Sequence, residues 1–91
     1  MEDIRIKMKD IKIGKFTILV EKIKTIYKQN NISINYYTQL TKDGKFIGKN
    51  GNEVNWGSEA MYHFFSKSLY SQTMKDIKQY WEIELKNLDW I

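Results

Sequence analysis

Residues 44–50 carry the pattern that comes closest to a phosphate-binding loop. They read Gly-Lys-Phe-Ile-Gly-Lys-Asn, which resembles a P-loop, where backbone amides and a lysine bind phosphate oxygens. The two glycines are one residue closer together than the P-loop motif requires. Asn50 also stands where a serine or threonine would hold magnesium. Hairpin turns explain the same glycines, so we expect no nucleotide site here.

His63 is the only histidine, and it is the best candidate for acid–base chemistry. A general base needs a partner in space, and Ser58, Glu59 and Ser66 are its polar neighbours in sequence. A metal site would need several histidines, cysteines or clustered carboxylates, and the chain has no cysteine. We therefore predict a protein that is not an enzyme and has no metal or cofactor. A small hydrolase centred on His63 is a minor alternative.

The basic residues are unevenly distributed along the chain, whose net charge is +4. Residues 1–28 carry eight basic against four acidic groups, and residues 29–50 carry three against one. Residues 51–91 carry four lysines against six acids. This asymmetry suggests a polyanionic partner on the N-terminal side. Codon bias in an AT-rich genome would also produce many lysines, and the single arginine weighs against base-specific recognition.

Length and composition indicate one small globular domain, residues 1–91, with 42% apolar residues. The absence of cysteine fits a reducing compartment. The N-terminus lacks the apolar core of a signal peptide, and the longest apolar run, residues 18–20, is far too short for a membrane span. We expect a soluble cytoplasmic protein.

The periodicity of apolar residues predicts the elements that would position these groups. Residues 3–9 alternate between apolar and basic side chains, which is typical of a strand, and the alternation shifts after Asp10, as at a bulge or tight turn. Residues 15–29 place six apolar side chains on one helical face and predict a helix, with a strand as the alternative. Residues 32–56 predict a three-stranded meander with turns at Asp43-Gly44 and Asn50-Gly51.

Two further helices are predicted, over residues 58–70 and 73–88, although residues 80–88 also alternate as a strand would. The predicted fold class is therefore α+β. It consists of a small antiparallel sheet, made of the N-terminal strand and the meander, packed against about three helices (15–29, 58–70 and 73–88).

The order helix–strand–strand–strand–helix over residues 15–70 is similar in topology to double-stranded RNA-binding domains. The meander and following helix, residues 32–70, also resemble the arm-binding domains of some recombinases. The RNA-binding family normally has a pair of lysines at the start of its last helix. Here that start reads Gly57-Ser58-Glu59-Ala60, which is neutral to acidic.

Strand alternation places Tyr36 inside the sheet and Tyr37 outside it. If helices cover one face, the other face would carry Arg5, Lys7 and Lys9 together with Asn35, Tyr37 and Gln39. A basic sheet with an exposed ring can bind single-stranded nucleic acid, because rings stack on bases and lysines neutralise phosphates. The predicted nucleic-acid-binding residues are Arg5, Lys7, Lys9, Lys12, Tyr37, Lys42, Lys45 and Lys49.

We therefore predict a small non-enzymatic protein whose lysine-rich side engages nucleic acid or a nucleoprotein complex. The alternative is a protein–protein interaction module, such as a phage or mobile-element inhibitor of a host defence system, comparable to an anti-CRISPR protein. Its partner would be a larger protein. Trp81 and Trp90 would then form the interface, because tryptophan is enriched at interface hot spots.

Overall fold

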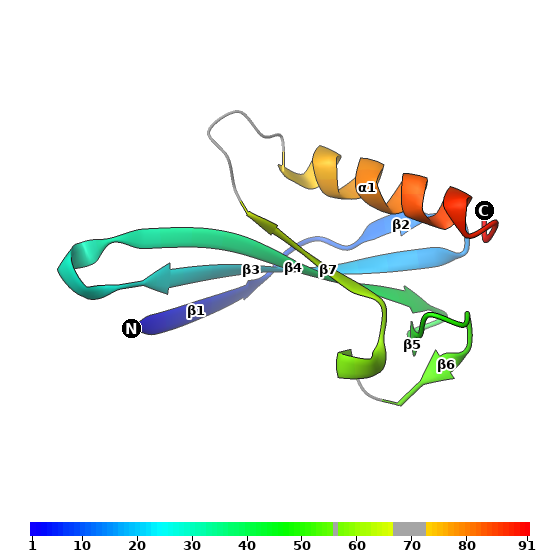
Figure 1. Cartoon of the computed structure of the whole chain (residues 1–91), viewed down its shortest axis with the longest axis horizontal. Coiled ribbons are helices and arrows are strands. Elements are labelled where there is room, and N and C mark those ends of the chain that lie inside the picture. Colours follow the sequence, from blue (N-terminus) through cyan, green and yellow to red (C-terminus); the bar gives the residue numbers. More distant parts are fainter. Residues whose placement is uncertain (56, 67–72) are drawn as a thin grey trace.

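The computed structural model describes residues 1–55, 57–66 and 73–91. In these residues, seven strands form one sheet, and an α-helix packs on it (Figure 1). The strands are β1 (Glu2–Lys7), β2 (Ile11–Ile13), β3 (Phe16–Ile26), β4 (Ile32–Lys42), β5 (Lys45–Ile47), β6 (Glu53–Val54) and β7 (Tyr62–Ser66). The helix is α1 (Thr73–Asn87), and two short 3₁₀ turns are η1 (Lys28–Asn30) and η2 (Gly57–Glu59).

The long hairpin of β3 and β4 is the frame of the molecule. Each of its strands has 11 residues, and they pair over their whole length. Strands β1 and β2 pair one after the other with β3, while β7 and β5 pair with β4, and β6 extends the sheet beyond β5. All these pairings are antiparallel. The helix covers one half of the sheet, and the far end of the hairpin projects beyond it with β1 (Figure 1).

The prediction of about three helices on a small sheet is wrong, because two of the predicted helices are strands or turns. Residues 15–29 contain β3 and the first two residues of η1. Residues 58–70 contain part of η2 and all of β7, and residues 67–70 of that prediction lie outside the described residues. The helix predicted over 73–88 is present as α1, so the strand alternative for 80–88 is wrong.

The error over residues 15–29 has a physical cause. The buried side chains of β3 change parity along the strand: the even-numbered residues Phe16, Ile18 and Val20 are buried first, and the odd-numbered Ile23 and Thr25 are buried farther along. Phe16 and Val20 point to the helix, while Leu19 and Ile23 point to the opposite face, and their spacing along the chain imitates one face of a helix. Ile18, the one residue that the helical stripe left out, is completely buried.

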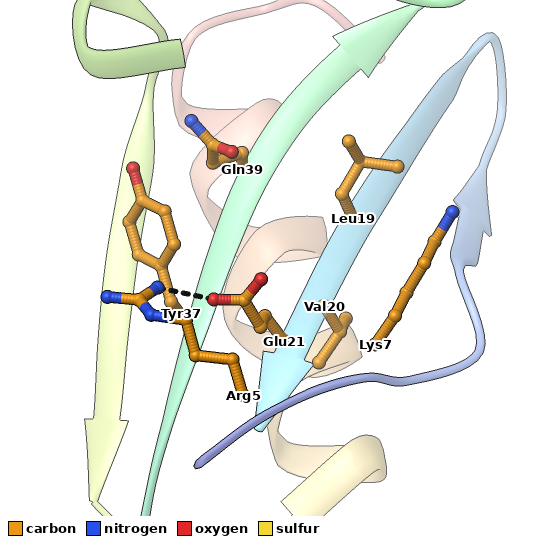
Figure 2. A pocket seen from close by; sticks show the side chains of 7 residues that line it. All are labelled: Arg5, Lys7, Leu19, Val20, Glu21, Tyr37 and Gln39. Atoms are coloured by element: carbon orange, nitrogen blue, oxygen red, sulfur yellow. Dashed lines mark hydrogen bonds and ion pairs between the residues drawn. The ribbon is translucent and has the colours of Figure 1, made fainter. Parts of the chain in front are cut away.

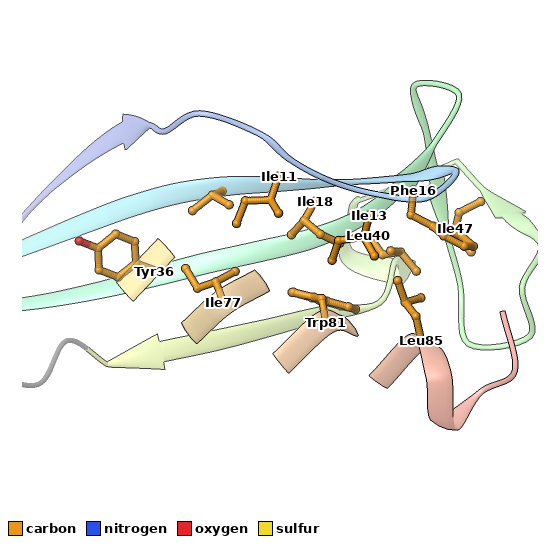
Figure 3. Packing of buried hydrophobic residues seen from close by; sticks show 11 residues of the cluster. Ile11, Ile13, Phe16, Ile18, Tyr36, Leu40, Ile47, Ile77, Trp81 and Leu85 are labelled. Carbon is orange, nitrogen blue, oxygen red and sulfur yellow. The ribbon is translucent and has the colours of Figure 1, made fainter. Parts of the chain in front are cut away.

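The core lies between α1 and one face of the sheet (Figure 3). The helix contributes Ile77, Trp81 and Leu85, which follow one another at intervals of four residues and so lie on one face. They pack on Ile18, Leu40 and other buried side chains of β2 to β5. Each such side chain stabilises the fold by about 1.5–3 kcal/mol when it is buried. The helix is therefore held to the sheet by a narrow apolar stripe.

The meander predicted over 32–56 is present as β4, β5 and β6; Trp56 lies outside the described residues. Gly44 and Gly51 have φ angles of 76° and 82°, which favour glycine, at the two turns that the sequence marked. The predicted irregularity after Asp10 is also present. Residues 8–10 separate β1 from β2, and the pairing with β3 moves by one residue between them.

The similarity in topology to double-stranded RNA-binding domains and to recombinase arm-binding domains does not hold. Both resemblances need a helix after the meander, and the chain forms η2 and β7 there. The first also needs a helix at 15–29, where β3 lies. Among the described residues, no helix is long and apolar enough to cross a membrane.

Candidate functional site

The two faces of the sheet differ, and the pairing register identifies the side chains on each. Paired residues in an antiparallel ladder point to the same face, and successive residues alternate. Ile18, Tyr36 and Leu40 are buried on the face that α1 covers. The opposite face carries Arg5 and Lys7 of β1, Glu21 of β3, Asn35, Tyr37 and Gln39 of β4, and Tyr62 and Phe64 of β7. We call it the open face.

Three aromatic rings form a cluster on the open face, and we call it the ring cluster: Tyr37, Tyr62 and Phe64. The rings of Tyr37 and Phe64, which are paired across β4 and β7, stack with centroids 4.8 Å apart and planes at 28°. The ring of Tyr62 contacts both, at 5.6 Å from Tyr37 and edge-on at 5.9 Å from Phe64. Tyr62 is 51% and Phe64 55% exposed, so much of this aromatic surface meets solvent.

A shallow pocket of about 350 Å³ lies beside the ring cluster (Figure 2). It is lined by Arg5, Lys7, Leu19, Val20, Glu21, Tyr37 and Gln39. The guanidinium of Arg5 donates a hydrogen bond to Glu21 and forms an ion pair with it. Lys7 stands directly opposite Glu21 in the register of β1 and β3, yet no ion pair of Lys7 occurs in the part of the chain that the structure describes. One acidic group therefore faces two cations, and the pocket keeps positive charge.

The polar side chains around the pocket are held in place by hydrogen bonds. The amide of Gln39 donates to the carbonyl oxygen of Gly57 at 2.6 Å and thereby ties η2 to β4. The hydroxyl of Ser66 donates to Oδ1 of Asn35 at 3.1 Å, which links β7 to β4. These contacts hold β7, which carries two of the three rings, against the centre of the sheet.

The pKa of Tyr37 is raised above its ordinary value of 10.0. Burial against its neighbours is the main cause, and the nearby Tyr62 and Glu21 add to it, while Arg5 acts in the opposite direction. The phenol is therefore neutral at physiological pH. A neutral ring adds no negative charge to the surface, which suits stacking with a base beside a phosphate.

The structure brings together only part of the predicted basic set. Arg5, Lys7 and Tyr37 share one pocket. Lys12 of β2 is opposite Thr17 and therefore also lies on the open face, four residues farther along β3 than Lys7. Because a strand rises about 3.3 Å per residue, Lys12 is roughly 13 Å from Lys7 along the sheet.

The remaining predicted lysines lie elsewhere. Lys9 is between β1 and β2, outside both strands. Lys42 and Lys45 are paired with each other across the β4–β5 turn and line a different hollow, where Lys45 forms an ion pair with Glu53 at 3.3 Å. Lys49 is in the turn that leads to β6. The set therefore divides between the open face and the β5–β6 end.

The tryptophans proposed for a protein interface pack inside the structure. Trp81 is 1% exposed, and its indole N–H donates to the hydroxyl of Thr38 at 2.9 Å. Trp90 is half-buried and stacks on Phe16, with ring centroids 6.1 Å apart. The side chain of Trp81 therefore belongs to the core of this chain and is not exposed to a second protein.

His63 belongs to β7 and points toward α1, where its ring stacks on Tyr80 at 4.2 Å and meets Phe65 edge-on at 4.6 Å. The rings of Tyr80 and Phe65 therefore both pack on the imidazole. Within residues 1–55, 57–66 and 73–91, no group of three or more histidines, cysteines or carboxylates could hold a metal ion.

Sequence reasoning missed Tyr62 and Phe64, because it placed them on a helix. The signal for a strand was present in the run Tyr-His-Phe-Phe, since aromatic residues favour strands and alternate rings would then share a face.

Comparison with known proteins finds no matching family model, no matching curated protein and no matching solved structure.

Proposed function

We propose that this chain is a non-enzymatic binding protein that takes single-stranded nucleic acid on its open face. The observation that carries the proposal is the exposed ring cluster of Tyr37, Tyr62 and Phe64, with Arg5 and Lys7 beside it. Proteins that bind single strands combine aromatic platforms for bases with cations for the backbone. Both parts are present here on the side of the sheet opposite α1, which no helix among the described residues covers.

Phe64 is the first place for a base to stack, because it is the most exposed ring of the cluster. Its inner neighbour Tyr37 is stacked on it and supports it from the side. Stacking of a base on an aromatic side chain contributes about 1–3 kcal/mol. A strand that lies across β7, β4, β3 and β1 would then pass from the rings to Lys7 and Arg5, where its phosphates find positive charge.

A duplex fits this surface less well. The bases of a duplex are paired and stacked on one another, so they are not free to stack on protein rings. The proposal therefore predicts a preference for single strands over duplexes of the same sequence. A single arginine in the whole chain also argues for binding with little base specificity.

Fluorescence anisotropy with labelled single- and double-stranded DNA and RNA, at about 50 and 200 mM salt, tests the proposal. We expect micromolar binding of single strands that weakens with salt. The variant Phe64→Ala should weaken binding about 5- to 150-fold, which corresponds to the loss of one stacked base.

Ile83→Ala is the matched control for Phe64→Ala. Ile83 is a large apolar side chain of similar exposure, 52%, and it lies on α1, on the other side of the sheet. This control should bind like the wild type. No binding of any single strand at micromolar protein and low salt would refute the proposal, and so would equal losses in the two variants.

A protein-interaction module is the second candidate, and the same ring cluster favours it, since exposed aromatic residues are typical of interface hot spots. In that case the open face would bind a larger protein, for example as an inhibitor. Such binding would depend on Phe64 but only slightly on salt. Co-purification with a partner, lost in Phe64→Ala and kept in Ile83→Ala, would distinguish it from nucleic-acid binding.

A further inference from the structure

Strand β1 forms a free edge of the sheet. It pairs with β3 on one side, and no described strand pairs with its other side. Figure 1 shows it at the outside of the molecule, beside the projecting end of the β3–β4 hairpin. A free edge presents unpaired N–H and C=O groups that can pair with another strand. A strand that pairs with this edge must have backbone groups and side-chain charges that complement those of β1.

The hydrogen bond of Met8 shows which groups point outward. Its N–H donates to the carbonyl oxygen of Val20 on β3 at 2.9 Å, in the same register as the rest of β1. In an antiparallel pair, the backbone groups of alternate residues point to the same side. Even-numbered residues of β1 therefore bond to β3. Asp3, Arg5 and Lys7 direct their N–H and C=O groups to the free edge.

The charges of β1 make it complementary to itself in the antiparallel direction. The strand reads Glu-Asp-Ile-Arg-Ile-Lys, so its first two residues are acidic, and its basic residues come at the fourth and sixth positions. Antiparallel pairing with a second copy would bring the acidic end of one strand to the basic end of the other. Parallel pairing would instead place like charges side by side, which is unfavourable.

One register satisfies both the backbone and the side chains. With Ile4 opposite the partner's Ile4 on the two-fold axis, Asp3 lies opposite the partner's Arg5, and Arg5 opposite the partner's Asp3. These are residues whose backbone groups point outward, so each pair also exchanges hydrogen bonds across the edge. The register therefore places an acidic and a basic side chain opposite each other twice, once on each side of the axis, and Arg5 would lie between Glu21 of its own chain and Asp3 of the second copy.

The apolar side chains of β1 support the same arrangement. Ile4 is 38% and Ile6 46% exposed, and both point to the face of the sheet that α1 covers elsewhere. In the symmetric pair, Ile4 of each copy would shield that of the other at the axis. An edge strand normally avoids exposed isoleucines, because they invite pairing.

We propose that β1 is a homodimerisation edge, at which two copies of this chain join antiparallel strands into one continuous sheet. The contact is short, five residues of β1 (residues 2–6) from each copy, so the dimer is weak, with a Kd on the order of 100 µM. The inference does not rest on nucleic-acid binding. The two open faces would lie on the same side of the joined sheet, because the two-fold axis is perpendicular to it.

Sedimentation velocity from about 5 µM to about 1 mM protein tests the proposal, since this range spans the expected Kd. Wild-type protein should pass from monomer to dimer. Asp3→Arg and Arg5→Glu should each weaken self-association about tenfold, because each puts like charges opposite one another twice. An equimolar mixture of these two variants should associate like the wild type, because opposite charges then meet at both positions.

Asp3→Pro separates pairing from folding. Proline removes an N–H that points to the free edge and leaves the hydrogen bonds to β3 intact, so the variant should keep its thermal stability and remain a monomer. Glu2→Gln is the control, because Glu2 would face the partner's Ile6 and meets no charge there. A monomer at every concentration would overturn the proposal. So would a dimer that Asp3→Pro leaves unchanged, or a mixture that associates no more tightly than the separate variants.

Discussion

The hydroxyl of Thr38 joins three elements, and its removal is the most informative test of the fold. It accepts a hydrogen bond from the indole N–H of Trp81 at 2.9 Å and donates one to the carbonyl oxygen of His63 at 2.9 Å. These bonds connect β4 to α1 and to β7. Thr38 is fully buried and Trp81 is 1% exposed, so water does not reach the site.

Thr38→Val keeps the shape of the side chain and removes the hydroxyl. The indole N–H then remains buried without a partner, which costs about 1–3 kcal/mol of unfolding free energy. The carbonyl oxygen of His63 also loses a donor, so we expect a total near the upper end, about 2–3 kcal/mol. The melting temperature should then fall by roughly 8–24 °C, because 1 kcal/mol corresponds to about 4–8 °C in a domain of this size.

Urea unfolding followed by circular dichroism gives the free energy, and a double-mutant cycle gives the coupling. Trp81→Phe removes the donor, so in the double variant no indole N–H is left unsatisfied. The cost of Thr38→Val should therefore be smaller in the Trp81→Phe background than in the wild type, by about 1 kcal/mol or more. A loss below about 0.5 kcal/mol in Thr38→Val, the size of an ordinary surface effect, or strictly additive variants, would refute this account of the core.

Three further predictions follow from the turns, the ring cluster and the lysines. Gly51→Ala should destabilise the fold more than Gly44→Ala in chemical denaturation. Both positions have positive φ, but a Cβ at Gly51 would come within 3.3 Å of the Trp90 ring, whereas a Cβ at Gly44 would meet no atom within 4 Å. Equal losses of stability in the two variants would contradict this contact. Burial raises the pKa of Tyr37, so the stability that this phenol contributes is complete below pH 10.0, its ordinary pKa, and is lost as the pH rises through the raised value. Between about pH 9 and pH 11 the wild type should therefore lose more stability than Tyr37→Phe. Identical profiles of stability against pH in the two proteins would contradict this contribution of the Tyr37 phenol. If single strands bind the open face as far as β2, Lys12→Ala should lower the slope of log K against log salt by about 0.7, and an unchanged slope would place Lys12 outside the interface.

Local signals in the sequence predict some parts of this fold well. The two turns of the meander need positive φ, and Asp43-Gly44 and Asn50-Gly51 supply residues that adopt it, whatever the rest of the chain does. Helix α1 is predicted because its apolar residues recur every four positions and its outer face is polar. These elements depend on contacts close in sequence.

Strands β3 and β7 could not be identified in the same way, because their environment comes from distant residues. Strand β3 buries even-numbered residues as far as Val20 and the odd-numbered Ile23 and Thr25 beyond it, which gives it no clean alternation. Strand β7 has rings on both faces, with Phe65 under the helix and Phe64 on the open face, so its apolar residues suggest a helical stripe. In both cases the position in the sheet, which the sequence does not state, decides the structure.

The correction at β7 changes the basis of the proposed binding. The sequence suggested a platform of lysines with one exposed ring, whereas the structure places Tyr62 and Phe64 beside Tyr37 and directs Lys42 and Lys45 into a different hollow. Each cation lost from the surface lowers the salt dependence of nucleic-acid binding. Each ring gained adds stacking energy to the binding, and salt does not screen stacking. The interface in the structure has rings at its centre and only a few cations at its margin. Its affinity should therefore fall less steeply with salt than that of the surface predicted from the sequence, whose eight residues are mostly lysines. A steep slope, together with an affinity that Phe64→Ala left unchanged, would show that charge, and not stacking, holds the ligand.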